Sequence, residues 1–519
     1  MKNHSYPGEL RTILLSIGLV FGTTLLAAAE PHDDRTRLII LADMGNEPDE
    51  MQQMVHMVAC SNEFVPEGLI AVTGKYLHPD SHIEYRRVTH PELFHEIIDA
   101  YEKVLPNLRQ HASGWHEPDY LRSIVCAGQT GYGIDDVGEG KSSPGSDLIV
   151  AALEKKDPRP IWIVVNAGSN TLAQALFEFR RDHSRLELND ALTKIRVFEN
   201  GAQDNAGAWI CQQFPAIHWI RSNYQTYAYG GPGGTDGDLT VNLGPHFWGD
   251  YAYSVAGQND WLIEHVMTDH GPLGEVYPER RYHAFKNGGL GFKEGGGTIP
   301  WMGLVNRGLF SIDHPHWGGW GGRFTQNKVA DFWSRHRDIS ADEKRHAPFY
   351  THREASDVWT NPADGKTYHG DYVPVWRWRE AMYNDFRCRM DWTISSYADA
   401  NHHPVAAFHE DMTDKIIEID VLPGEVLELD ASKSHDPDGD SLNIHWWIYA
   451  EAGTYAGEVF IASPQELGTT VTIPTGAAGK QIHVILEVKD ENAIASLFDY
   501  RRIVLNVAPV YDHAGISRQ

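Results

Sequence analysis

Cysteine is scarce in this chain of 519 residues, which has four: Cys60, Cys126, Cys211 and Cys388. None of them has C-x-x-C spacing, which excludes the zinc ribbons and thioredoxin-like pairs that need it. Disulfides are also dispensable here, because 42% of the residues are apolar and a chain of this length can bury large cores. We therefore expect four buried free thiols.

Positive charge is also in short supply, with 44 Lys and Arg residues against 71 Asp and Glu residues and a formal net charge of −27 at pH 7. Such a surface repels phosphate groups, so nucleic acid and anionic membranes are unfavourable partners. A neutral glycan is compatible with it. The 16 Trp and 22 Tyr residues have flat rings that stack on sugars, although a core position is the commoner role for any single Trp.

Several catalytic signatures are missing as well. The chain has no G-x-S-x-G motif, so it lacks the nucleophile elbow of an α/β-hydrolase. It has no H-E-x-x-H motif among its 28 His residues, which argues against a zinc-protease helix. The stretch from Gly138 to Ser142 resembles a phosphate-binding loop, but Asp135 stands where that loop needs its first Gly. The chemistry must come from other side chains.

Long apolar runs are absent except near the N-terminus, where Lys2 and Arg11 precede an apolar segment at 13–26 and three Ala residues. This pattern is typical of a secretory signal peptide, which we expect over residues 1–29 with cleavage after Ala29. The run is too short for a convincing membrane span. We therefore expect a secreted or periplasmic protein with no membrane partner.

Residues 35–400 alternate between strand-like and helix-like segments, which predicts a doubly wound, mostly parallel α/β sheet. The expected strands are Leu38–Ala42, Gly68–Thr73, Pro160–Asn166, Lys194–Asn200 and Ala216–Arg221, and the expected helices lie near 51–60, 146–155, 171–181 and 204–213. From about residue 230 the pattern gives way to long Gly-, Trp- and His-rich segments that indicate functional loops. The spacing of apolar residues predicts a further helix over 376–400.

Beyond Pro404 the pattern changes to short β-like segments separated by Gly, Pro and Asp turns. The expected strands are 416–421, 426–429, 443–449, 469–473, 481–488 and 501–507. This series predicts a β-sandwich domain, which we place at 404–509. Its turn from Asp436 to Asp440 resembles the loop of PKD-like and cadherin-like modules. A Ca²⁺ site and a plain Asp-rich turn are both open there, the turn being the commoner case.

The most informative stretch is the apolar run 38–42, which is followed directly by Asp43-Met-Gly-Asn-Glu-Pro-Asp-Glu50. The run predicts a strand buried on both faces, and the apolar spacing after it predicts an amphipathic helix. The acids therefore lie at the carboxyl end of a strand, where open α/β sheets bind ligands and where clustered oxygens suit Ca²⁺ or Mg²⁺. Asp49 and Glu50 alone would also be explained as acids at a helix start, but Asp43 would not.

Three segments resemble the motifs of nucleoside hydrolases. The turn Asp43–Glu50 resembles their D-x-D-P-G-x-D-D opening, 164–176 resembles their A-T-G-P-L-T-N-L-A-L-A-L turn and helix, and 200–208 repeats their N-x-x-x-D-P-E-A-A spacing. A closer resemblance is to a secreted nucleoside-hydrolase-like family of cellulose-binding proteins with a C-terminal sandwich module. It rests on five motifs in order, at 46–50, 67–73, 157–160, 317–323 and 376–386.

The resemblance implies one Ca²⁺ held by first-strand acids and a turn carbonyl. Asp43 would be the general base and a metal ligand, Asp49 a second catalytic and metal-binding residue that contacts the sugar, and Glu50 a further ligand. The backbone carbonyl of Asn166 would be another ligand, and Glu294 is the nearest candidate for a late acidic one. The implied substrate contacts are Asn46, Glu47, Asn170, Asn200 and Asp204.

Two functions are open on these grounds. The first is a Ca²⁺-assisted hydrolase of glycosyl bonds acting on a glycan or a nucleoside-like substrate, with a general base and an oxocarbenium-like transition state. The second is a non-catalytic protein that binds cellulose or another polysaccharide. Acids at strand ends favour the first, and the abundant Trp residues favour the second.

Overall fold

The computed structural model describes residues 1, 33–229, 261–278, 294, 296–305, 308–329, 337–362 and 365–509. Residues Arg35–Gln519 form one compact unit, separate from Met1–Asp34. The expected signal peptide lies, apart from residue 1, outside the described residues, as does much of the expected loop region between 230 and 293. No helix in the described part of the chain is both long enough and apolar enough to cross a membrane.

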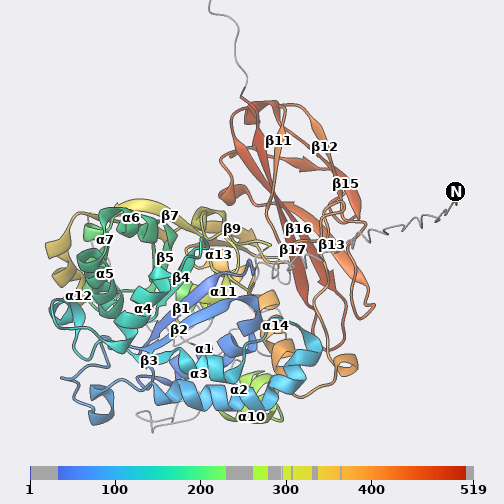
Figure 1. Cartoon of the computed structure of the whole chain (residues 1–519). Coiled ribbons are helices and arrows are strands. Elements are labelled where there is room, and N and C mark those ends of the chain that lie inside the picture. Colours follow the sequence, from blue (N-terminus) through green and yellow to red (C-terminus); the bar gives the residue numbers. More distant parts are fainter. Residues whose placement is uncertain are drawn as a thin grey trace, which may run out of the picture. The chain divides into compact units, whose positions relative to one another are not determined.

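The centre of the molecule is an eight-stranded sheet with the order β3-β2-β1-β4-β5-β6-β8-β7 (Figure 1). All neighbours in it are parallel except β7 and β8. The strands are β1 Arg37–Ala42, β2 Val65–Ala71, β3 Val125–Ala127, β4 Ile161–Val165, β5 Ile195–Asn200, β6 His218–Ser222, β7 Phe324–Val329 and β8 Phe349–Glu354. This sheet confirms the predicted fold class. The strand order reverses between β1 and β4, the kind of position where such sheets bind ligands.

Helices cover both faces of this sheet (Figure 1). The helices are α1 Pro48–Ala59, α2 Glu92–His111, α3 Pro118–Ser123, α4 Pro144–Glu154, α5 Asn170–Asp182, α6 Arg185–Lys194, α7 Ala206–Gln213, α10 Gly271–Glu275, α11 Ile299–Met302, α12 Arg337–Glu343, α13 Val373–Trp376 and α14 Arg379–Asp391. In β1, Leu38 and Ile40 pack in one core with α1, α2 and α14, while Ile39 and Leu41 pack in another with α4, α5 and α7. Side chains of a strand alternate between faces, so both faces of β1 must be apolar.

Several elements differ from the sequence-based expectation, among them the late helix and α2. The helix expected over 376–400 is shorter, because α14 begins at Arg379 and ends at Asp391, after which the chain turns and the Trp392 indole donates to the Asn401 carbonyl at 2.8 Å. Helix α2 was not expected, although its buried residues repeat at helical spacing. The four thiols are free, as expected, but Cys126 is half-buried.

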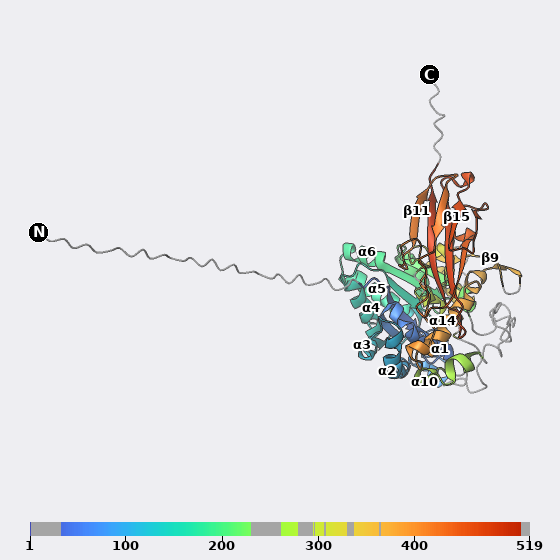
Figure 2. The ribbon, with the colours of Figure 1, turned by 90° about the vertical axis from the view of Figure 1, so that its right-hand side faces the viewer.

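Residues 417–507 form two further sheets, one with the order β11-β17-β16-β13 and one with the order β12-β15-β14. Figures 1 and 2 show these strands grouped together in orange and red. Their bounds are β11 Ile417–Val421, β12 Val426–Asp430, β13 Leu442–Ile448, β14 Phe460–Ile461, β15 Gly468–Thr472, β16 Gln481–Asp490 and β17 Phe498–Val507. Residues of both sheets share one apolar core, so the predicted β-sandwich is present. The boundary at 404 stays a prediction.

Buried polar contacts join the sandwich to the α/β part. Asp385 of α14 accepts hydrogen bonds from Arg389 at 2.9 Å and from the His403 ring at 2.8 Å, and the other nitrogen of that ring lies 2.9 Å from the carbonyl of Phe498 in β17. Arg502 of β17 donates to the carbonyls of Leu309 and Gly318 at 2.8 and 3.0 Å. A short hairpin of β9 Asp357–Thr360 and β10 Thr367–Gly370 lies nearby, since Tyr449 donates to Asp357 at 2.7 Å. Charged side chains thus hold the two parts together.

Candidate functional site

The site begins where β1 ends. Asp43 follows the last strand residue and is 1% exposed. A tight turn returns the chain, with the Asn46 N–H donating to the Asp43 carbonyl at 2.9 Å. Gly45 has a φ of 88°, and a Cβ there would lie 2.8 Å from the His90 ring, so this position requires glycine. The turn thereby holds the Asp43 side chain at the carboxyl edge of the sheet.

Two more acids follow in the first turn of α1. The helix begins at Pro48 with Glu47 at its N-cap, and no side chain makes a capping hydrogen bond. Glu50 is buried and accepts hydrogen bonds from Gln53 at 3.3 Å and from the Asn166 amide at 3.5 Å. The structure thus directs Glu50 toward the neighbouring strand end. Asp49 lies in the first turn of α1, where the helix dipole favours an acid. Stabilisation of the helix start, the alternative to a role in a ligand site, also predicts an acid at this position.

The ends of β4 and β5 lie beside that of β1. Leu41 is paired with Val165, and Val165 with Glu199, so Asn166, one residue past β4, and Asn200, the last residue of β5, continue the same row. Gln203 crosses from the β5 turn and donates to the Asn166 backbone carbonyl at 2.9 Å. The predicted convergence of Asp43, Asn166 and Asn200 is therefore a property of the sheet.

This edge holds an excess of hydrogen-bond acceptors. Six oxygens are buried and have no hydrogen-bond partner within the described part of the chain: Asp43 Oδ2, Asn46 Oδ1, Asn166 Oδ1, Asn170 Oδ1, Asn200 Oδ1 and Gln203 Oε1. Buried polar atoms are usually paired, and each one left without a partner costs about 1–3 kcal/mol. A ligand that supplies positive charge or hydroxyl donors would satisfy them. We name this set, together with Asp49 and Glu50, the oxygen crevice.

The acids of the oxygen crevice resist ionisation. Burial raises the pKa of Asp43 well above its ordinary value, and the nearby charges of Asp49 and Glu47 raise it further. Burial and the charge of Asp43 likewise raise the pKa of Glu50, against the hydrogen bonds from Asn166 and Gln53. Burial, Glu47 and Glu50 raise the pKa of Asp49. A cation placed here would reverse these shifts.

Several residues of the site were not anticipated from the sequence. Arg86 donates to the Asn46 carbonyl at 2.8 Å, and its charge lowers the pKa of Asp43. Nothing local marks it, because it lies in a short 3₁₀ turn more than 35 residues along the chain. The sequence could have indicated Gln53, because it lies one helical turn after Glu50 and so on the same side of the helix.

Two glycines let a late segment approach the crevice. A Cβ at Gly296 would lie 2.3 Å from the Asn200 amide, and one at Gly297 would lie 2.9 Å from the Asn166 amide. The Gly297 carbonyl also accepts a hydrogen bond from Asn166 at 3.3 Å. The Gly-rich run after Glu294 is therefore explained by close packing over these strand ends.

Two predicted site residues have other partners. Asp204 accepts hydrogen bonds from the backbone N–H groups of Ser169 and Asn170 at 3.0 and 3.1 Å, and from the Ser169 hydroxyl at 2.7 Å. Glu294 accepts them from Tyr277 at 3.2 Å and Thr298 at 2.8 Å, and lies 2.9 Å from the His56 ring. Their carboxylates support the β4–α5 turn and the late segment. Neither Asp204 nor Glu294 is among the ligand contacts proposed below. The substrate contact expected for Asp204 and the metal ligation expected for Glu294 stay predictions.

The donor set favours a hard cation only in part. Carboxylate and amide oxygens are ligands that Ca²⁺ prefers. Among the described residues, however, Asp43, Asp49 and Glu50 do not form a group of three acids whose oxygens all lie within 4.8 Å of one another. A cation here would therefore need amide oxygens as well. The amide oxygens Asn46 Oδ1 and Asn166 Oδ1 have no partner among those residues, and neither does the carboxylate oxygen Asp43 Oδ2.

Two other groups could be considered for a metal. In the turn 436–440, Asp436 accepts hydrogen bonds from the backbone N–H groups of Asp438 and Asp440 at 2.8 and 3.1 Å, which is the geometry of an Asp-stabilised turn. His56, Cys60 and Asp385 also lie close together. Arg389 already pairs with Asp385, so a cation there would meet a like charge. The second group is therefore a poor cation site, whereas a Ca²⁺ site and a plain Asp-rich turn both stay open at 436–440.

The Trp residues of the sequence motifs are core residues. Trp317, Trp320, Trp376 and Trp378 are all buried. Arg323, at the end of the first of these motifs, is paired with Asp357 at 2.7 Å. The commoner role of an aromatic side chain, burial, therefore applies to all four rings, and Trp378 in addition lines a cavity.

A parallel sheet with this strand order, buried acids at its switch point and a following β-sandwich define a nucleoside-hydrolase-like class of protein. The family model described as "Cellulose-binding Sde182, nucleoside hydrolase-like domain" matches residues 37–324, and "Cellulose-binding protein Sde0182, C-terminal domain" matches residues 426–507. The chain belongs to this Sde182 family, which confirms the resemblance predicted from its motifs.

One of the solved structures that match the chain agrees with this assignment. A nucleoside hydrolase-related hypothetical protein from Saccharophagus degradans, described as associated with carbohydrate metabolism, is 34% identical with a TM-score of 0.75, and the match covers 91% of this chain and 100% of that one. The PKD domain of human KIAA0319 is 18% identical over 20% of this chain and 91% of that one, with a TM-score of 0.13. None of the curated proteins compared with the chain matches it.

Proposed function

We propose that this protein hydrolyses a glycosyl bond of a carbohydrate in the oxygen crevice, with Asp43 as the general base. The observation that carries the proposal is the Asp43 carboxylate, which is buried at the switch point of the sheet with one oxygen unpartnered among the described residues. Burial raises the pKa of Asp43, which makes its carboxylate a stronger proton acceptor than an exposed one.

The other crevice residues would orient the sugar. The amide oxygens of Asn46, Asn166 and Asn200 would accept hydrogen bonds from its hydroxyls. Asp49 and Glu50 would lie against the developing positive charge of the sugar ring. Gly296 and Gly297 would exclude water from one side of the site, as their close approach to Asn200 and Asn166 indicates.

We further propose that Asp43, Asp49, Glu50 and the Asn166 backbone carbonyl hold a Ca²⁺ ion. Their raised pKa values and the unpartnered oxygens support a cation at this position. When bound, the ion would supply positive charge that binds sugar hydroxyls and lowers the pKa of a water molecule. Asp43 would accept the proton from that water.

A hydrolysis screen tests the proposal. The purified protein is incubated with cellulose, xylan, other glycans and nucleosides, with Ca²⁺ or with EDTA, and the release of reducing sugar or free base is measured. We expect turnover with at least one substrate, and its loss both in EDTA and in Asp43→Asn. Absence of turnover on every substrate with Ca²⁺ present would overturn the hydrolase.

A second candidate function is binding of a polysaccharide without catalysis. Both family models are described as cellulose-binding, and the crevice acids do not form a compact metal group among the described residues. Affinity electrophoresis in gels that contain cellulose derivatives or xylan tests this function. Retarded migration together with an inactive protein would support it, and unretarded migration in every gel would exclude it.

We also propose that the protein is exported, on the strength of the basic, apolar and Ala-rich pattern over residues 1–29. Amino-terminal sequencing of the protein recovered from expression with its full N-terminus tests this. A start at Glu30 supports export, and a start at Met1 contradicts it.

A further inference from the structure

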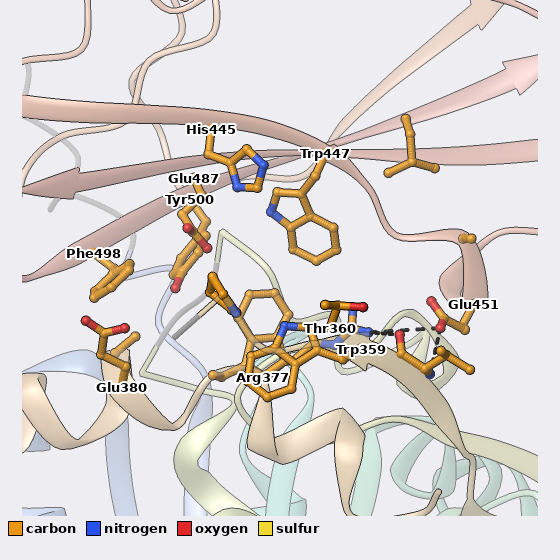
Figure 3. Close-up of a pocket in the computed structure, with 16 residues that line it drawn as sticks. Trp359, Thr360, Arg377, Glu380, His445, Trp447, Glu451, Glu487, Phe498 and Tyr500 are labelled. Carbon is orange, nitrogen blue, oxygen red and sulfur yellow. Dashed lines mark hydrogen bonds and ion pairs between the residues drawn. The ribbon is translucent and has the colours of Figure 1, made fainter. Parts of the chain in front are cut away.

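A cavity lies between the sandwich and the α/β part and shares no residue with the oxygen crevice. Its volume is about 410 Å³, within the range of small-molecule sites. Figure 3 shows Trp447, Glu487 and Tyr500 extending from sandwich strands toward Trp359 and Arg377 of the α/β part. We name it the aromatic pocket.

Strand alternation explains why these side chains face the cavity. In β13, Trp446 packs in the sandwich core, whereas Trp447 points to the opposite face and packs against the α/β core. In β17, Tyr500 also belongs to the α/β core, while Ile503 belongs to the sandwich core. The outer face of this sheet therefore presents aromatic rings where the α/β part leaves space.

The rings are accompanied by hydrogen-bonding groups. Trp378 Nε1 and Arg377 Nε are buried donors without a partner within the described part of the chain, and both residues line the cavity. The Arg377 guanidinium lies 5.5 Å from the centre of the Trp447 ring. Unpartnered donors inside an aromatic cavity call for a ligand with accepting oxygens.

The charges of the pocket are mostly balanced within the protein. Lys489 pairs with Glu380 at 2.8 Å, and Arg377 lies 4.0 Å from Glu451. Burial and the charge of Glu380 raise the pKa of Glu487 to about 7, so that it is partly protonated at neutral pH. An anionic ligand would meet these carboxylates, and a cationic one would compete with Lys489 and Arg377. A neutral ligand matches the pocket best.

We propose that the aromatic pocket binds a neutral oligosaccharide, with sugar rings stacked on Trp447 and Trp359 and hydroxyl oxygens accepting from Arg377 and Trp378. Flat rings match the apolar faces of a pyranose, and the carboxylates around them accept from its hydroxyls. The site is independent of catalysis in the oxygen crevice. The choice of β-glucan and related probes rests on the carbohydrate ligand of the proposed function.

The test measures binding of cellohexaose, xylohexaose and mannohexaose to the full chain by calorimetry. The variants are Trp447→Ala and Trp359→Ala. The matched control is Trp209→Ala, which removes a half-buried Trp of α7 outside the pocket, and Asp43→Asn reports on the crevice. We expect at least one probe to bind, with an affinity at least about tenfold weaker in both pocket variants and unchanged in Trp209→Ala.

Other outcomes would overturn the proposal. These are absence of binding of all three probes to the unaltered protein, unchanged affinity in both pocket variants, and loss of affinity in Asp43→Asn alone. The last outcome would assign binding to the crevice instead. Because Trp447 packs against a core, near-ultraviolet circular dichroism is used to check that the Trp447→Ala variant is folded. Glu487→Gln provides a variant of conserved shape, which should weaken binding at pH 8, where the carboxylate acts as an acceptor.

Discussion

At the scale of single residues, the proposed hydrolysis depends most directly on Asp43. Asp43→Asn keeps the shape of the side chain but removes the base, so we expect kcat to fall by at least about 100-fold. The measurement is the initial rate on whichever substrate the screen identifies. Asp119→Asn is the control, because Asp119 is an exposed acid paired only at the surface with Arg122. Equal rates in both variants would remove Asp43 from the mechanism.

The raised pKa values of the crevice acids also predict how stability depends on pH. The folded protein holds protons on Asp43, Asp49 and Glu50 after the unfolded chain has released them near their ordinary values of 3.8 and 4.5. Stability from these groups therefore falls as pH rises above about 4. Thermal melts between pH 4 and 8 should show a smaller decline in Asp43→Asn than in the unaltered protein. An identical decline would contradict the assignment.

Ca²⁺ should counteract that loss. At pH 8 the acids are forced toward ionisation, so a cation that binds the folded state stabilises it by about 2.7 kcal/mol at a hundredfold excess over its dissociation constant. We expect a higher melting temperature with Ca²⁺ than with EDTA, and no such difference in Asp43→Asn. A melting temperature independent of Ca²⁺ in the unaltered protein would argue against a calcium site.

At the scale of elements, the segment over the crevice depends on glycine. A Cβ at Gly296 would strike the Asn200 amide, so Gly296→Ala should shift this segment, destabilise the protein by about 1–3 kcal/mol and weaken substrate binding. Gly468→Ala is the control, since nothing lies within 4 Å of a Cβ there. Chemical unfolding and KM measure the two effects. Equal stability of both variants would contradict the tight packing.

The sequence revealed those elements whose pattern is local. The buried run 38–42 and the helix after it were predicted correctly, because continuous and periodic apolar residues are visible in one chain segment. The strands β7 and β8 were missed, since their place at the sheet edge depends on residues far apart in the sequence. The partners of Asp204 and Glu294 were hidden for the same reason, as side-chain hydrogen bonds leave no local trace.

At the scale of the whole molecule, Asp385 connects α14 to the sandwich. It lies buried between Arg389 and His403, so Asp385→Asn should leave a charge unpaired and cost about 3–5 kcal/mol. Chemical unfolding measures this. The exposed pair of Asp190 and Lys194 gives the control Asp190→Asn, with an expected loss below about 1 kcal/mol. A loss of that small size in Asp385→Asn would contradict the connection.

Acidic pH should weaken the same connection. The pH dependence of stability that Asp385 causes has the opposite sign to that caused by the crevice acids. Arg389 and His403 hold the pKa of Asp385 below its ordinary value of 3.8. Its contribution is therefore complete above that value and lost as pH falls below it. Stability should thus decline on both sides of a maximum in mildly acidic solution, and Asp385→Asn should flatten the acid side.

The hydrogen bonds from Arg502 to the carbonyls of Leu309 and Gly318 have a consequence for biosynthesis. These carbonyls leave the ribosome almost two hundred residues before the arginine that holds them. A nascent chain can thus complete every strand of the large sheet while this segment still lacks its partner. A truncated chain that ends before β17 would keep every crevice residue. Its segment around Leu309 and Gly318 would lack the hydrogen bonds from Arg502 and would be exposed to quality-control proteases in that state.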